Sequence, residues 1–392
     1  MIQETKKRLW TKDFVLLTSA NLLMAIAFYF MTPVMPLFMA DRFQSDTAEI
    51  GMIMFTFAVA AIIMRPFSGF LLDFLNRYVV YLIAFVFFML LFLGYALAAT
   101  VTLMLVLRFL HGLTWGTMNT AAYTMAVDLT PAKRRGEGLG FFGLSMNVAM
   151  AVAPMLALAI IHRSGYNILF YSAVLFCFVA LLCAFFVRVP QLSRTASVKF
   201  SFSGLFEKSA LPIALIALLT QVSYGGILSF IALYGREIGV ESSGLFFLLL
   251  SVGLAIARIL SGRLFDKIGP AKVSFFGLIL LVFGLVLVGY APTSIGFHCA
   301  AFVLGIGFGV LAPAFQAMAN NHVVPERRGA ANSTYLMFFD SGIGIGMLLF
   351  GQLIDRIGYA GTFYVSAVIT LVALIVFFSY TLPNYLKTKE SF

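Results

Sequence analysis

The sequence predicts an all-α polytopic membrane protein with twelve transmembrane helices in two parallel six-helix pseudo-repeats. Three observations predict this fold class: the composition, the spacing of the apolar runs and an internal repeat. Of the 392 residues, 61% are hydrophobic and 11% are charged. That is more apolar side chain than a globular domain of this length can bury, and it indicates a lipid environment.

Apolar runs recur from one end of the chain to the other. They lie near residues 14–39, 47–72, 79–99, 102–127, 139–161, 168–187, 211–234, 245–264, 272–291, 295–319, 330–352 and 361–382. Each is close to the ~20 residues that a helix needs to cross a hydrocarbon core of ~30 Å. The runs are too continuously apolar for the strands of a membrane barrel, which alternate.

Lysine and arginine are concentrated in alternate connections between these runs. If the N-terminus is cytoplasmic, the inner segments hold nineteen basic residues, whereas the outer loops hold only Arg42, Arg163, Arg236 and Arg356. The positive-inside rule therefore predicts a multi-pass protein with both termini in the cytoplasm, and we expect a bacterial cytoplasmic (inner) membrane. Placed in this way, the net charge of +10 gives no support for a nucleic-acid partner.

The sequence gives no pattern for catalysis or metal binding. Cys177, Cys183 and Cys299 lie inside runs, without ligand spacing to histidine or acid. Neither a Ser-His-Asp nor a His-x-x-x-His arrangement is apparent, so we expect no enzyme, no metal site and no cofactor. The polar stretch Met1–Lys12 precedes a full-length run with no small-residue cleavage site, and no removable signal peptide is expected.

The chain repeats itself at an interval of 193 residues. The stretch from Arg65 to Asp73 matches the stretch from Arg258 to Asp266, and Arg134-Arg135-Gly136 matches Arg327-Arg328-Gly329. Because the interval holds six runs, an even number, the two halves have the same orientation in the membrane. We therefore predict six-helix bundles at residues 1–188 and 211–392, joined by a basic, serine-containing cytoplasmic linker at 189–210.

Several motifs resemble those of the major facilitator superfamily, and the resemblance covers nearly the whole chain. The family's signature loop, Gly-x-x-x-Asp-Arg/Lys-x-Gly-Arg/Lys, is matched by Gly262, Asp266, Lys267 and Gly269, with Lys272 displaced from the final basic position. The first half keeps Gly69, Asp73 and Arg77, although Phe74 and Asn76 depart from the motif. Arg108 and Gly112 fit the Arg-x-x-x-Gly motif of helix 4. Gly140, Ala149, Ala153 and Pro154 keep the helix-5 spacing of the drug/proton antiporters, with alanine twice in place of glycine, and we expect them to pack helices closely.

The resemblance also implies a charged cytoplasmic latch for the outward-facing state. Its members would be Asp73 and Asp266, with Asp128, Lys267, Arg134, Arg135, Arg327 and Arg328 as further members or partners, beside the glycines Gly69 and Gly262. The alternative is that the two loop acids are solvated turn carboxylates.

Arg108, Trp115 and Asn119 form a polar and aromatic face on one apolar run. At about 100° per residue, Gly112, Trp115 and Asn119 all lie within ~40° of Arg108. We expect this face to be hidden from lipid and to serve substrate binding or proton coupling; the alternative for Arg108 is a side chain that snorkels to the headgroups. His111 beside it is either a titrating group or a hydrogen-bonding wall residue.

Asp340 is the only carboxylate near the middle of a run, and its counterpart in the first half is Asn147. An ionisable residue within the membrane is a functional hypothesis by default. Burial would disfavour its charged form and let it carry a proton, unless a nearby arginine opposes this. The alternative is a structural acid bonded to its neighbours.

Further candidates for a substrate cavity are polar and aromatic residues on the first helices of each repeat and on their neighbours. They are Asn21, Phe28, Tyr123, Gln221, Tyr224, Gln316, Asn320 and Tyr335. Small and amide side chains also join membrane helices, so packing is the alternative role for each. The aromatic content favours an amphipathic cargo over a sugar.

The resemblance implies a proton-coupled secondary exporter of small amphipathic molecules, which works by alternating access as a monomer and draws its energy from the proton gradient. The alternatives are a proton-coupled metabolite importer and a lipid or metallophore transporter of the same fold. A membrane receptor or lipid scramblase would need no coupling carboxylate, so its activity should survive replacement of Asp340 by asparagine.

Overall fold

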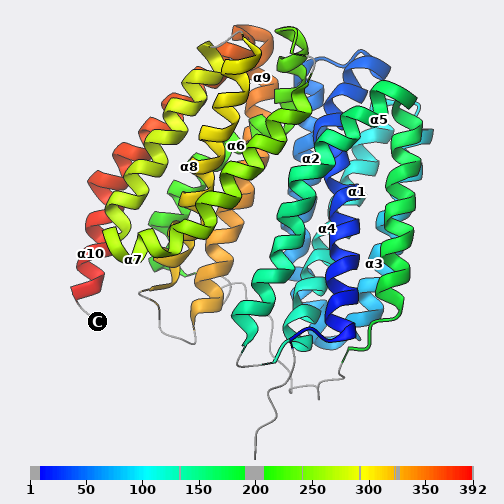
Figure 1. Cartoon of the computed structure of the whole chain (residues 1–392), viewed down its shortest axis with the longest axis horizontal. Helices are drawn as coiled ribbons and strands as arrows, with labels where there is room; N and C mark the ends of the chain where they lie inside the picture. The colour runs from blue at the N-terminus through cyan, green and yellow to red at the C-terminus, as the bar shows by residue number, and fades with distance from the viewer. Residues whose placement is uncertain are drawn as a thin grey trace, which may run out of the picture. The chain divides into compact units, whose positions relative to one another are not determined.

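In a computed structural model, the chain is described at residues 9–131, 134–189, 207–240, 242–290, 293–321, 323 and 327–390, and these residues form helices and short connections without strands. The helices are α1 (Lys12–Phe43), α2 (Thr47–Phe74), α3 (Arg77–Leu97), α4 (Val101–Leu129), α5 (Arg135–Phe185), η3 (Lys208–Ala210), α6 (Leu211–Glu237), α7 (Ser243–Tyr290), α8 (Ser294–Asn321), α9 (Arg328–Val376), η5 (Phe377–Thr381) and α10 (Leu382–Glu390) (Figure 1).

Three of these helices are broken at a glycine. Gly165 in α5, Gly269 in α7 and Gly358 in α9 have φ of 79°, 79° and 71°, with ψ between 166° and 176°. This backbone conformation is essentially restricted to glycine, and it ends one helix and starts the next within a single residue. At 1.5 Å per residue, the 51 residues of α5 would otherwise extend ~77 Å, far beyond a hydrocarbon core of ~30 Å.

The described helices supply ten candidate membrane spans. Three of them contain a glycine break: Glu137–Phe185 at Gly165, Lys267–Tyr290 at Gly269 and Ala330–Lys387 at Gly358. α7 already supplies two candidates, Ser243–Ser261 and Lys267–Tyr290. Dividing the two long spans at Gly165 and Gly358 would give twelve. The all-helical fold is confirmed, and the count of twelve stays a prediction.

The 193-residue period recurs in the bounds of the elements. α8 begins 193 residues after α4, α9 begins 193 residues after α5, and Gly358 follows Gly165 by the same interval. The counterpart of Gly269 is Asn76, whose side chain caps α3 by accepting from the backbone N–H groups of Tyr78 and Val79. The same break is thus made by a glycine in one half and by a capping residue in the other.

The helices gather into two compact units. Unit 1 comprises Met1–Met31 and Val59–Val198, and unit 2 comprises Thr32–Ala58 and Lys199–Phe392. Residues 32–58 belong to unit 2 because α2 packs on α9 there: Gly51 faces Gly351, and the Thr47 hydroxyl donates to the Gly351 carbonyl over 2.7 Å. The six-helix bundles predicted at residues 1–188 and 211–392 are the two halves of the repeat, and their boundaries stay a prediction.

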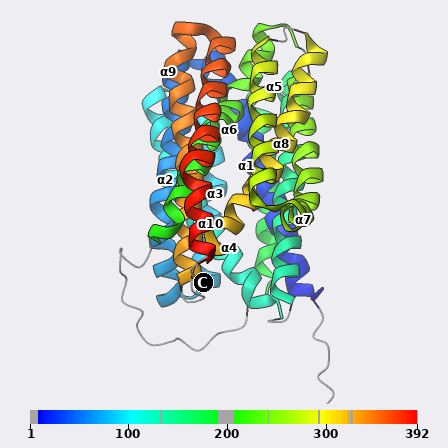
Figure 2. The same ribbon diagram turned by 90° about the vertical axis from the view of Figure 1, so that its left-hand side faces the viewer.

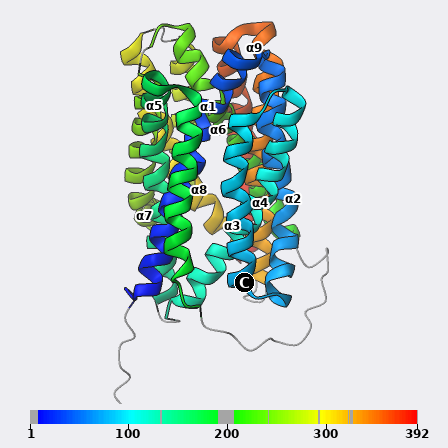
Figure 3. The same cartoon turned by 90° about the vertical axis from the view of Figure 1, so that its right-hand side faces the viewer.

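Unit 1 is built around α3 and α4, which lie side by side (Figure 3). Phe85, Phe88, Phe92 and Tyr95 of α3 are fully buried, and Gly94 of α3 faces Leu107 of α4. The aromatic residues recur every three or four positions, so that one face of α3 carries all of them.

Unit 2 is held together by glycines that bring helix backbones into contact. Gly305 and Gly309 of α8 face the backbone of α7 at Leu250 and Leu254, and Gly342 and Gly346 of α9 face the backbone of α6. Both pairs have the small-xxx-small spacing that lets membrane helices approach closely. Figure 2 shows α9, η5 and α10 following one another along this unit.

The predicted packing residues of α5 differ in their surroundings. Ala149 and Ala153, near Pro154, are fully buried. A Cβ added at Gly140 would meet open space, so this glycine makes no close helix contact in the structure. The predicted role of Gly140 in packing therefore has no contact to support it.

Candidate functional site

The polar face predicted on α4 is buried in unit 1. Arg108 is 3% exposed, His111 1% and Trp115 8%. Arg108 is therefore enclosed by protein and not exposed on the surface of the helix bundle. Burying a guanidinium is costly without polar partners, so its neighbours define the chemistry of the site.

His111 lies within an aromatic shell supplied by α3. Its ring centroid is 4.3 Å from that of Phe88 and 4.8 Å from that of Phe92. The Tyr95 hydroxyl is 2.7 Å from His111 Nδ1, and Tyr95 also interacts with the Arg108 side chain. Tyr95 thus joins the two predicted coupling residues in one buried network.

Tyr95, Phe88 and Phe92 were not among the residues predicted for the site. In the sequence they are marked only by their i, i+4, i+7 spacing on one face of α3, and any packed apolar helix shows the same spacing. The hydrogen bond to His111 is what distinguishes Tyr95 from a packing residue.

An aromatic wall extends from this network to α1. The rings of Phe28 and Trp115 stack with their centroids 3.8 Å apart and an interplanar angle of 15°. Phe28 and Asn119 are half-buried. Tyr123, farther along α4, is 37% exposed and packs edge-on against Phe142. The structure therefore brings Phe28 and Trp115 together and places Tyr123 in a separate contact.

Asn21 forms a buried polar pair with Ser145 of α5. Its Nδ2 donates to the Ser145 Oγ over 2.8 Å, and Ser145 donates to the carbonyl of Phe142. In the part of the chain that the structure describes, Asn21 Oδ1 has no hydrogen-bond partner. The amide therefore joins two helices and also offers one buried acceptor.

In unit 2, Gln221 and Tyr224 lie on α6. Gln221 is 4% exposed, and among the described residues its Oε1 has no hydrogen-bond partner. The Tyr224 ring contacts Phe308 of α8 with its centroid at 5.0 Å. This gives unit 2 a buried amide acceptor one helical turn from an aromatic contact.

Asp340 lies on the part of α9 before the break at Gly358. It is twelve residues beyond the start of the helix, or ~18 Å at 1.5 Å per residue, and it is half-buried. The hydroxyl of the buried Tyr335 donates to the Ala312 carbonyl over 2.9 Å and lies within electrostatic range of both Asp340 and Arg258.

Arg258 of α7 is a site residue that the sequence analysis did not select. It lies within electrostatic range of Tyr224 as well as Tyr335, which connects two predicted residues to one cation. The sequence could have identified Arg258 as a candidate, because it is one of three arginines within or at the edge of the apolar runs and matches Arg65 in the repeat.

Gln316 and Asn320 lie near the end of α8 and are engaged with protein groups. Gln316 is exposed, and its Nε2 donates to Asn332 Oδ1 over 2.7 Å. Asn320 donates to the Gln316 carbonyl over the same distance. These bonds favour the packing alternative for both residues.

The predicted latch is described in part. Asp128 of α4 pairs with Arg77 of α3, with 2.7 Å between Oδ2 and NH1 and side-chain exposures of 7% and 28%. Arg134 pairs with Glu137 one helical turn away, and Lys267 is exposed. The side chains of Asp73, Asp266, Arg135 and Arg328, and the surroundings of Gly69 and Gly262, lie outside what the structure describes.

Arg327 pairs with Glu207, which the sequence analysis placed in the linker without a role. Arg327 Nε is 2.9 Å from Glu207 Oε2, and the Glu207 backbone N–H donates to Thr334. Burial raises the pKa of the Glu207 carboxyl, but hydrogen bonds from Arg327 and Ser209 and the charge of Arg327 more than offset this, so the pKa lies below its ordinary value. The start of α6 is thereby fastened to α9.

Loss of the Arg77–Asp128 pair is expected to destabilise unit 1. Replacing Arg77 by glutamine leaves a largely buried carboxylate without its cation, and we expect a loss of about 1–3 kcal/mol in unfolding free energy. Thermal unfolding of the detergent-solubilised chain measures this. The double variant Arg77→Gln/Asp128→Asn should be less destabilised than the sum of the single variants; additive effects would show that the pair contributes no coupling.

Among the described residues, no group of three or more His, Cys, Asp or Glu side chains is placed to hold a metal ion. Within each unit, the candidate site residues are instead ionisable, amide and hydroxyl groups, several of them beside aromatic rings. Groups of this kind can bind and release a small molecule or a proton.

Comparison with known proteins identifies the family. The model of the Major Facilitator Superfamily matches residues 17–323 and 213–391. The chain is 26% identical over 381 residues to the multidrug resistance protein MdtG of Klebsiella pneumoniae, with 92% of each chain covered. It is 23% identical over 362 residues to the uncharacterized MFS-type transporter MJ1560 of Methanocaldococcus jannaschii, which covers 88% of this chain and 92% of that one.

Solved structures show the same fold. A bacterial homologue of the human lysosomal transporter Spinster superposes with a TM-score of 0.81 at 16% identity, covering 98% of this chain and 99% of the other. The nucleoside transporter NupG superposes with a TM-score of 0.76 at 14% identity, covering 94% and 99%. Since the family model extends over both halves, the chain belongs to the major facilitator superfamily and is a multi-pass membrane transporter, not an enzyme.

Proposed function

We propose that this transporter is a proton-coupled exporter of small amphipathic molecules in a bacterial cytoplasmic membrane, working by alternating access with both termini in the cytoplasm. The observation that carries the proposal is Asp340, a half-buried carboxylate midway along a membrane helix. Asp340 and Arg258 both lie within electrostatic range of the buried Tyr335. Placing an ionisable side chain within a membrane helix costs free energy, and such residues typically mark proton or substrate pathways.

The mechanism uses Asp340 as the group that exchanges protons for cargo. Uptake of a proton from the outer side neutralises the carboxylate and weakens its hold on the cargo, which is then released outside. Loss of the proton to the cytoplasm restores the charge for the next cycle. A membrane potential of 100 mV supplies ~2.3 kcal/mol for each charge moved.

Residues within each unit support this cargo class. The stacked Phe28 and Trp115 and the contact of Tyr224 with Phe308 offer flat apolar surfaces, and Asn21 and Gln221 each offer a buried amide oxygen. Sites of this kind suit a molecule with an aromatic body and a few polar groups. The relatives named as multidrug resistance proteins support the same cargo class.

Transport by the full chain in proteoliposomes tests the proposal. We expect ethidium, an amphipathic aromatic dye, to be moved against its concentration gradient when a pH gradient is imposed, in the direction opposite to proton flow. Collapse of the gradient by a protonophore should stop accumulation.

Dye movement in the same direction as the protons would support the importer alternative. Accumulation that ignores the pH gradient would exclude proton coupling. A lipid or metallophore transporter would move neither the dye nor compounds that compete with it.

A further inference from the structure

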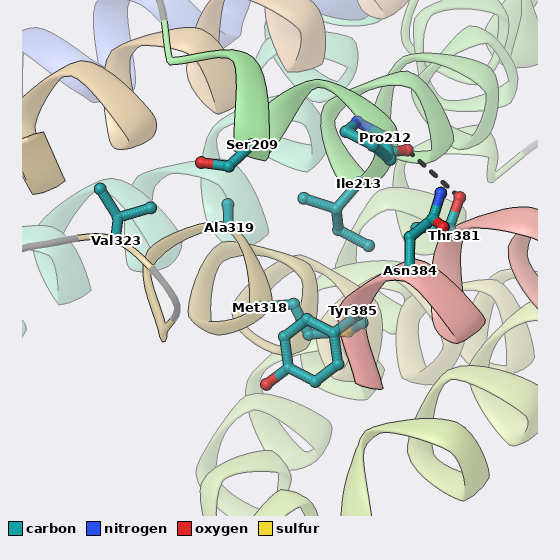
Figure 4. Close-up of a pocket in the computed structure, with 9 residues that line it drawn as sticks. All are labelled: Ser209, Pro212, Ile213, Met318, Ala319, Val323, Thr381, Asn384 and Tyr385. Atoms are coloured by element: carbon teal, nitrogen blue, oxygen red, sulfur yellow. Dashed lines mark hydrogen bonds between the residues drawn. The ribbon is translucent and has the colours of Figure 1, made fainter. Parts of the chain in front are cut away.

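A small amphipathic pocket lies in unit 2, where the start of α6, the end of α8 and the η5–α10 segment meet (Figure 4). Its floor is apolar, because Ile213, Met318 and Ala319 are between 2% and 4% exposed. Its rim is polar and open: Ser209 is exposed, and Asn384 and Tyr385 are half-buried. An occupant therefore needs one apolar part and one polar part.

The size of the pocket excludes a drug-sized cargo as its main occupant. Its volume is about 150 Å³, whereas pockets for drug-sized ligands occupy roughly 300–1,000 Å³. A cavity of this volume holds a group about as large as benzene. It can take a short length of hydrocarbon chain while the rest of the molecule stays outside.

The pocket lies at the ends of the membrane spans that form it. The span that includes α6 begins at Lys208, next to Ser209, and the span that includes α10 ends at Lys387, two residues beyond Tyr385. Lysine side chains that flank apolar membrane helices reach the headgroup layer. A molecule with its chain in the pocket thus has its polar group at headgroup depth.

Exposed lysines lie next to the lining residues in the sequence. Lys208 directly precedes Ser209, and Lys387 follows Asn384 by three residues in α10, whereas none of the residues that line the pocket is charged. The nearest acid in sequence, Glu207, is bonded to Arg327 and Ser209. Lysines at the membrane surface attract anionic headgroups, so these positions complement a phosphate-bearing lipid.

The segment that closes the pocket departs from a regular α-helix. Between Phe377 and Thr381 the helix is widened into a π-helical turn, with the Leu382 N–H bonded to the carbonyl of Phe377, and α10 follows. In the first half, α5 ends at Phe185, and residues 187–189, which correspond to residues 380–382, are not helical. π-helical turns recur at functional sites.

We propose that this pocket binds an anionic phospholipid, with part of an acyl chain on the floor formed by Ile213, Met318 and Ala319 and the phosphate near Lys208 and Lys387. The site is separate from the residues assigned to transport, and its test is a binding measurement on the full chain.

Native mass spectrometry of the purified chain, titrated with phosphatidylglycerol or phosphatidylcholine in a neutral detergent, measures retained lipid. We expect one phosphatidylglycerol to be retained at concentrations that leave phosphatidylcholine unbound. Lys208→Gln and Lys387→Gln should each weaken binding by about fivefold, the effect of one lysine near a membrane surface. Ala319→Leu, which fills the floor, should prevent retention.

Lys272→Gln is the matched control, since Lys272 is an exposed lysine of α7 outside the pocket and its removal changes the net charge equally. It should leave lipid retention unchanged. Equal retention of both lipids, equal effects of all three lysine variants, or displacement by soluble glycerol 1-phosphate would overturn the proposal, the last because it would identify a site for a phosphate ester without its chains. The lysine variants decide the question even if Ala319→Leu fails to fold.

Discussion

Replacing Asp340 by asparagine is expected to reduce gradient-driven export to the rate of protein-free liposomes. Asparagine has nearly the same shape and keeps the capacity for hydrogen bonding, but it cannot take up or release a proton at physiological pH. Movement of dye down its own concentration gradient, without a pH gradient, should persist, because alternating access itself does not require the proton. The two rates are measured in the same proteoliposomes.

Asp355→Asn is the matched control for this variant. Asp355 lies on the same helix, is exposed and undergoes the same chemical change. Its variant should transport as the wild type does. If Asp340→Asn retains gradient-driven export, proton coupling belongs elsewhere, and Arg108, His111 and Asp128 are the next groups to replace.

Introducing a methyl group at Gly346 is expected to destabilise unit 2 strongly. A Cβ at this position would collide with the backbone carbonyl of Val222 on α6, and the helices must separate to admit it. Overpacking of this kind costs about 1–3 kcal/mol. We expect Gly346→Ala to lower the midpoint temperature of unfolding of the detergent-solubilised chain. Size-exclusion chromatography of heated samples measures this midpoint.

Gly140→Ala separates the effect of close helix packing from the effect of replacing a helical glycine by alanine. Both changes add the same methyl group to a helix and gain the same helix propensity, roughly 0.5–1 kcal/mol. At Gly140 the methyl group meets open space. This variant should therefore be as stable as the wild type or slightly more stable, and an equal loss at both positions would mean that close packing at Gly346 is unimportant.

The fold class could be predicted because the solvent constrains it so strongly. A chain with this many apolar residues must satisfy its backbone within lipid, and helices do so locally. The repeat at 193 residues then predicted where elements recur, as α4 and α8 show. Harder to anticipate were the single-residue breaks, because Gly165 and Gly358 lie among many glycines and only the three-dimensional structure identifies the ones with positive φ.

The candidate site was predictable to the extent that polar residues are rare within the spans. Arg108, His111 and Trp115 stand out in an apolar helix, and the structure buries all three. Tyr95 could not be distinguished from the packing aromatic residues of α3. Its role depends on the hydrogen bond to His111 of α4, and no sequence pattern predicts which residues of two helices will meet. Glu207 was hidden for a similar reason, because its partner Arg327 lies 120 residues away.

The breaks at Gly165, Gly269 and Gly358 leave no slack between consecutive helices. A loop of several residues can absorb a displacement of one helix without moving the next, but a joint of one residue can only pivot. In α5, α7 and α9, the two helical segments therefore share a single hinge residue. Because only Gly358 separates the segment bearing Asp340 from the next one, a displacement of the end of the first segment also displaces the start of the second.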